Sequence, residues 1–65
     1  MNKEIYDYLI SHSPFSCYEC QDIALEINGT ESLMYIQDVL LKYMGGEDSY
    51  AYETTWELAE GIKRL

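Results

Sequence analysis

The sequence has few basic residues: four Lys and Arg stand against twelve Asp and Glu, a formal net charge of −8 over 65 residues. Proteins that bind nucleic acid usually rely on Lys and Arg to replace the counterions around phosphates. Because an excess of carboxylates repels phosphates, direct binding to nucleic acid is not expected. The same field attracts a basic protein surface from a distance at moderate salt.

Long apolar runs are also absent. A run such as Val39-Leu40-Leu41 is far too short to cross a bilayer, and the first residues do not have the apolar stretch of a signal peptide. We therefore expect a cytoplasmic protein without membrane association. The apolar share of 48 % and the seven tyrosines argue against a disordered acidic chain. The length allows a single domain, residues 1–65, with one small core.

Motifs for catalysis are missing as well. His12 is the only histidine, no two carboxylates have a spacing typical of an acid–base pair, and Gly45-Gly46 lacks the Lys-Ser/Thr of a phosphate-binding loop. His12, Cys17 and Cys20 form H-x4-C-x2-C, but a closed zinc site needs four ligands. We interpret Cys20 as a core residue and Cys17 as a reduced thiol near a helix N-terminus. No enzymatic activity, cofactor or metal site is predicted.

What is present is helical apolar spacing. Asn2 is expected to cap a helix over residues 3–12. Ser16 and Glu19 have the S-x-x-E relation of a capping box, which predicts the start of a second helix. Asn28-Gly29 is expected to end that helix, because glycine tolerates the left-handed conformation that follows many helices.

Thr30 is expected to cap a third helix, with Glu31 favoured at its positive end and Gly45-Gly46 ending it. Its predicted buried stripe consists of Leu33, Ile36, Val39, Leu40 and Tyr43. Met34, Leu41 and Met44 are expected to lie partly outside this stripe. A helix that is apolar over so much of its circumference is deeply buried or covered by a partner, so a monomer and a homodimer both stay open.

The C-terminal part is expected to change conformation at residue 54. Residues 49–54, SYAYET, alternate polar and aromatic side chains, which predicts one short strand or hairpin arm. A second capping box from Thr54 to Glu57 is expected to begin a final helix, with Trp56 on its packed face and its last turn weakened by Gly61. The predicted fold class is therefore mainly α (α+β): a domain of three or four helices with one short β-strand or hairpin.

This order of elements resembles a winged helix-turn-helix domain. CQDIALEING would be the positioning helix, TESLMYIQDVLLKYMGG the recognition helix, and SYAYETTWELAEGIKRL the strand and closing helix. The resemblance implies a DNA-binding transcriptional regulator. Its DNA contacts would be Gln37, Lys42, Lys63 and Arg64.

The charge of the exposed positions favours a different function. In size, charge and tyrosine content the chain is similar to small acidic inhibitors of phages and plasmids, including anti-CRISPR and anti-restriction proteins that act as DNA mimics. This similarity implies an inhibitor that binds a basic nucleic-acid-binding host protein, such as a CRISPR or restriction component. Carboxylates spaced along helices approximate a row of phosphates, and tyrosines are favoured at interfaces. The predicted partner-binding residues are Glu19, Asp22, Glu26, Glu31 and Asp38, a second cluster of Glu47, Asp48 and Glu53, and the tyrosines Tyr35, Tyr50 and Tyr52.

Overall fold

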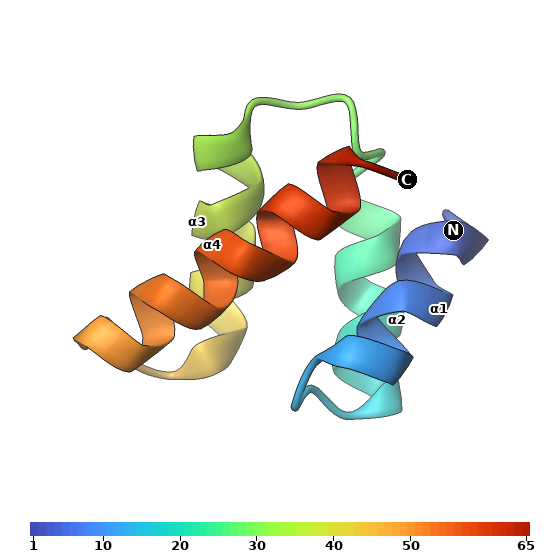
Figure 1. The fold of residues 1–65 in the computed structure, drawn as a ribbon. Helices are drawn as coiled ribbons and strands as arrows, with labels where there is room; N and C mark the ends of the chain where they lie inside the picture. The colour runs from blue at the N-terminus through green and yellow to red at the C-terminus, as the bar shows by residue number, and fades with distance from the viewer.

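Four helices make up most of the chain in the computed structural model, which describes residues 1–65. They are α1 (Lys3–His12), α2 (Cys17–Glu26), α3 (Leu33–Met44) and α4 (Ser49–Lys63). Helix α1 packs mainly on α2 and α3 mainly on α4, and contacts of α1 with α4 and of α2 with α3 join the two pairs (Figure 1). None of these helices is both long and apolar enough to cross a membrane.

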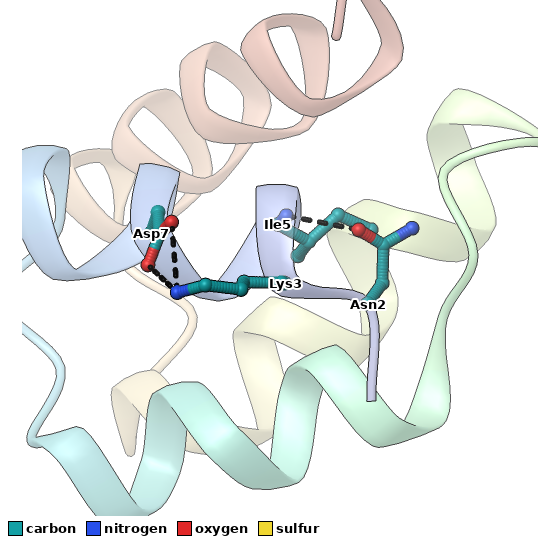
Figure 2. Close-up of polar contacts among 4 residues, drawn as sticks. All are labelled: Asn2, Lys3, Ile5 and Asp7. Atoms are coloured by element: carbon teal, nitrogen blue, oxygen red, sulfur yellow. Dashed lines mark hydrogen bonds and ion pairs between the residues drawn. The ribbon is translucent and has the colours of Figure 1, made fainter.

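The predicted cap and bounds of the first helix are confirmed. The Asn2 side-chain oxygen accepts a hydrogen bond from the Ile5 backbone N–H at 3.1 Å (Figure 2). The backbone N–H of Asn2 also donates to the carbonyl of Ala24, and its side-chain amide donates to the carbonyl of Asn28 at 3.2 Å. One residue therefore starts α1 and ties it to the C-terminal end of α2.

The second helix begins as predicted but ends earlier. Ser16 and Glu19 form the reciprocal capping box. The helix ends at Glu26, and Ile27 leaves it with an extended backbone because its side chain is fully buried in the core. Gly29 does have a positive φ of +91°; it makes the turn after the helix, where an alanine would be strained.

The third helix starts at a different cap from the one predicted. The Ser32 hydroxyl accepts from the Tyr35 N–H at 3.1 Å, so Thr30 is not the cap. The Glu31 carboxylate turns back and accepts the backbone N–H groups of Asn28 and Gly29. The predicted end is confirmed, since Gly45 adopts the left-handed conformation after Met44.

The predicted strand is wrong: the domain has no strand, and residues 49–54 form the first turns of α4. Asp48 is the cap, its carboxylate accepting from the Ala51 N–H at 2.9 Å. The buried residues of α4, at helical spacing, are Ala51, Thr55, Leu58, Ala59 and Ile62. This spacing of buried residues outweighs the β-propensity of tyrosine and threonine, which is weak against tertiary packing. A wing is therefore absent, and so is a second cap at Thr54.

The core takes side chains from all four helices. Its largest fully buried members are Ile5, Leu9, Ile23, Ile27, Ile36, Leu40 and Ile62. Leu41 is also buried, contrary to the expectation that it lies outside the α3 stripe; Met44 is partly buried and Met34 is exposed. Trp56 was expected on the packed face of its helix, but 39 % of it is exposed.

Gly61 does not end α4, which continues to Lys63. Its missing side chain leaves room for the ring of Tyr8, whose hydroxyl and ring carbon occupy the place where a Cβ would stand. The glycine therefore allows α1 and α4 to approach closely.

Candidate functional site

Two of the four cationic residues are used in ion pairs. Lys3 pairs with Asp7 one turn along α1, with 3.4 Å between Nζ and Oδ2 (Figure 2). Lys42, near the end of α3, pairs with Glu26 of α2 at 2.8 Å. This contact raises the pKa of Lys42, since the hydrogen bond to the Glu26 carboxylate stabilises the protonated amine.

The other two cationic residues lie at the end of α4 and bind carbonyl oxygens. Lys63 Nζ donates to the backbone carbonyl of Glu31 at 2.8 Å, and Arg64 Nε donates to that of Glu60 at 3.3 Å. Lys63 therefore lies near the start of α3, whereas Lys42 is nine residues from Leu33 along the same helix, roughly 14 Å away. No cationic ridge runs along α3, the surface that a helix-turn-helix regulator would present to DNA.

Several of the predicted partner-binding carboxylates have structural roles. Glu19 accepts the Ser16 N–H in the capping box at 2.9 Å, Asp48 caps α4, and Glu31 holds the turn before α3. Burial acts to raise the pKa of Glu31, but the backbone N–H groups that donate to its carboxylate outweigh burial and lower it. These three side chains are committed to the fold, which limits what they can offer a partner.

A first surface groove collects predicted residues from two helices and a loop. Glu26 of α2, Tyr35 and Asp38 of α3 and Glu47 of the α3–α4 loop line a hollow of about 390 Å³. Lys42 also lines it and neutralises part of the charge through its pair with Glu26. We call this hollow the Tyr35 groove.

A second groove lies along α4 and contains no basic residue. Its volume is about 760 Å³, and it is lined by Gln37, Glu47, Ser49, Tyr52, Glu53, Trp56, Glu57 and Glu60. We call it the Trp56 groove. Apolar atoms form most of its lining, and four of its eight residues are glutamates.

Helical spacing arranges the Trp56 groove in two adjacent rows. Tyr52, Trp56 and Glu60 follow one another at intervals of four residues, and Glu53 and Glu57 form the parallel row. Residues four apart on a helix are surface neighbours. The two exposed aromatic rings therefore lie directly beside a line of carboxylates.

Only part of this groove was in the predicted set. Glu47, Tyr52 and Glu53 were predicted, whereas Trp56, Glu57 and Glu60 of the same groove were not. The four-residue spacing of Tyr52, Trp56 and Glu60 could have identified them. This spacing has no meaning if residues 49–54 are interpreted as a strand. Gln37, one of the predicted DNA contacts, instead joins α3 to α4 by donating to the Tyr52 carbonyl at 3.1 Å.

Asp22 and Tyr50 belong to neither groove, although both are exposed. Asp22 nevertheless contributes to the field over α2. The pKa of Tyr43 is raised first by burial and then by the carboxylates of Glu26, Asp22 and Glu19. A phenol on α3 thus experiences the negative charge of the neighbouring helix.

His12, Cys17 and Cys20 do not form a metal-binding cluster, and no group of three or more His, Cys, Asp or Glu side chains is arranged to hold a metal ion. His12 is exposed, not packed among apolar side chains; its ring stacks on Tyr8 at 4.3 Å and its Nδ1 donates to the Tyr8 carbonyl. The prediction that Cys20 belongs to the core is confirmed, and burial raises the pKa of its thiol. Cys17 is exposed.

No protein-family model matches the chain, and neither does any curated protein or solved structure at a significant level. The likeness to acidic phage and plasmid inhibitors therefore stays a prediction from size and charge, and the helix-turn-helix resemblance gains no support. The geometry of the two grooves is the basis for a functional hypothesis.

Proposed function

We propose that this protein is a non-enzymatic binding module that docks its acidic surface onto the basic, nucleic-acid-binding surface of another protein and blocks it. The observation that carries the proposal is the imbalance of charge partners. Of the twelve acidic residues only Asp7 and Glu26 are in ion pairs, and all four cationic side chains already have an oxygen partner. The remaining negative charge is available to an external cationic surface, whose approach it accelerates.

The spacing of the carboxylates on α4 supports a mimic of nucleic acid. Glu53 and Glu57 are separated by about 6 Å along the helix axis, given a rise of about 1.5 Å per residue. Phosphates of one DNA strand rise about 3.4 Å per nucleotide and also rotate around the duplex axis, so neighbouring phosphates are roughly 7 Å apart in space. One turn of α4 thus offers carboxylates at close to the spacing of neighbouring phosphates. An inhibitor of a CRISPR or restriction component, carried by a phage or plasmid, is the setting in which we expect such a mimic.

The experiment is capture from a host lysate on the immobilised protein, with elution by rising salt. Retained proteins are identified and then assayed for binding to their nucleic acid with and without the purified protein. We expect retention of a basic nucleic-acid-binding protein, its release at moderate salt or by duplex DNA, and loss of its nucleic-acid binding when the module is added. Retention without competition would overturn the proposal, as would a purified protein that itself shifts duplex DNA at low salt.

Matched charge variants distinguish binding at a specific surface from a general effect of net charge. Glu53→Gln with Glu57→Gln changes the Trp56 groove, and Glu4→Gln with Asp7→Asn removes the same charge from exposed positions of α1 outside both grooves. The first pair should weaken competition more than the second. Equal weakening would indicate a nonspecific field and contradict a defined docking surface.

A further inference from the structure

We infer that the Trp56 groove binds an arginine side chain of the basic partner, with the guanidinium stacked on the indole of Trp56 and held at its edges by glutamates. This inference rests on the proposed function, because it assumes a basic protein partner. It goes further in naming the residue type recognised and the place where it is recognised.

The first argument is the exposure of two large aromatic rings at one place. Trp56 is 39 % exposed and Tyr52 46 % exposed, and they lie one helical turn apart in the same row. The aliphatic residues of α4 from Ala51 to Ile62 are buried, so the exposed apolar surface of this helix comes from its aromatic rings, two of which line the groove. Tryptophan and tyrosine are among the residues enriched at interface hot spots.

The second argument is charge complementarity. The face of an aromatic ring is the negative part of its quadrupole and attracts a cation within about 6 Å of its centre, tryptophan most strongly. Glu53 and Glu57 border the ring on one side and Glu60 follows it on the same row. A cation in the groove would therefore meet both the ring face and carboxylates, and no cation of this chain lines the groove.

The third argument concerns which cation fits best. A guanidinium is planar, stacks on a ring, carries five N–H donors for carboxylates and is weakly hydrated, whereas an ammonium is compact and strongly hydrated. A groove lined by an indole, a phenol ring and four glutamates therefore favours arginine over lysine. The volume of about 760 Å³ leaves room for more of the partner than one side chain.

The fourth argument is that the groove is preorganised. Gln37 bonds the carbonyl of Tyr52. On the opposite side of α4, the buried Thr55 hydroxyl donates to the carbonyl of Ala51 at 2.7 Å. These bonds hold the backbone beneath the aromatic row, so binding of a partner does not have to order it.

Trp56 is the only tryptophan of the chain, so its fluorescence reports the groove directly. The experiment titrates the protein at low ionic strength with two capped peptides of equal charge, Gly-Arg-Gly-Arg-Gly and Gly-Lys-Gly-Lys-Gly. Backbone amide shifts are recorded alongside the fluorescence. We expect the arginine peptide to change the emission of Trp56, to shift amides around the Trp56 groove, and to bind several-fold more tightly than the lysine peptide.

Single substitutions test the residues named. Trp56→Ala should weaken binding of the arginine peptide roughly two- to fivefold, the factor that corresponds to an exposed cation–π contact. Glu57→Gln should weaken it by a smaller factor. Tyr18→Ala on α2 is the matched control: it removes an aromatic ring that is 76 % exposed and lies outside both grooves, and binding should not change. Circular dichroism confirms that each variant keeps its helices.

Equal binding of the two peptides would overturn the inference, and so would amide shifts centred on the Tyr35 groove. A change of Trp56 emission with protein concentration alone would also overturn it, because it would indicate that a second copy of the chain occupies the groove. Failure here is distinguishable from failure of the proposed function. If Trp56→Ala leaves capture of the basic partner and competition with nucleic acid unchanged, only the arginine site is wrong. If the arginine peptide binds at Trp56 but no nucleic-acid binding is blocked, only the proposed function is wrong.

Discussion

Replacing Gly61 with alanine should destabilise the protein, although the same change in an ordinary helix interior is stabilising. Alanine is favoured over glycine in a helix by about 1 kcal/mol. Here the added Cβ would stand where the Tyr8 hydroxyl and ring carbon lie, and that ring is held by its stack on His12. Forcing a packed side chain aside typically costs about 1–3 kcal/mol. The net effect expected is a free energy of unfolding lower by about 1 kcal/mol.

A double-mutant cycle with Tyr8 tests this reasoning. Urea unfolding of the wild type, Gly61→Ala, Tyr8→Ala and the double variant is followed by circular dichroism. With the ring removed, Gly61→Ala should stabilise by about 1 kcal/mol, its intrinsic propensity. The substitution thus changes sign between the two backgrounds, a direct measure of coupling between contacting residues. If Gly61→Ala stabilises both backgrounds equally, α1 and α4 do not approach as closely as described.

Further predictions concern single side chains. Glu31→Ala should cost about 1 kcal/mol at pH 7, because it removes the acceptor for backbone N–H groups; chemical unfolding at several pH values measures this loss. The pKa of Glu31 in the folded protein lies below its ordinary value of 4.5. The stabilisation by its carboxylate is therefore complete above pH 4.5 and should vanish as the pH falls through the folded pKa. A stability difference between wild type and Glu31→Ala that grows on acidification would contradict this sign. Asp48→Ala should lower stability by about 1 kcal/mol through loss of a cap and reduce the helical dichroism, whereas a strand at the start of this segment would leave helicity unaffected. With a thiol reagent, Cys17 should react in the native protein and Cys20 only on unfolding, and equal native rates would refute the burial of Cys20.

Local signals predicted much of the helical structure. The Asn2 cap and the Ser16–Glu19 capping box depend on residues at most three apart, so they could be recognised before any tertiary contact was known. The end of α3 at Gly45 is of the same kind, since a left-handed residue there needs only a glycine.

Some errors arose where distant contacts decide the conformation. The Ile27 side chain is buried in the core and its backbone is extended, so α2 ends at Glu26 and not at the expected Asn28-Gly29. Thr30 and Ser32 are both acceptable caps in isolation. Here local bonds decide: the Glu31 carboxylate accepts the N–H groups of Asn28 and Gly29, and Ser32 becomes the cap.

The candidate site shows the same division. Its predicted acids are exposed or partly exposed, but only the fold separates Glu19, Glu31 and Asp48, which serve the backbone, from Glu53, which lines a groove. Trp56 was placed on a packed face because tryptophan is apolar. In the helix its angular position is outside the stripe that Leu58 and its neighbours bury.

By itself the sequence determined the large negative charge, the helical periodicity and the caps formed by near neighbours, since each depends only on residue type and short spacing. Only the tertiary structure decided that residues 49–54 are helical, because their burial depends on whether α1 and α3 are present to cover Ala51 and the residues that follow it at helical spacing. Because residues 49–54 are helical, Tyr52 lies one turn from Trp56 in an exposed aromatic row beside glutamates, and the alternation of tyrosines in the sequence does not correspond to a strand. The Trp56 groove is therefore a consequence of packing, and its constituents are neighbours only once α4 is continuous.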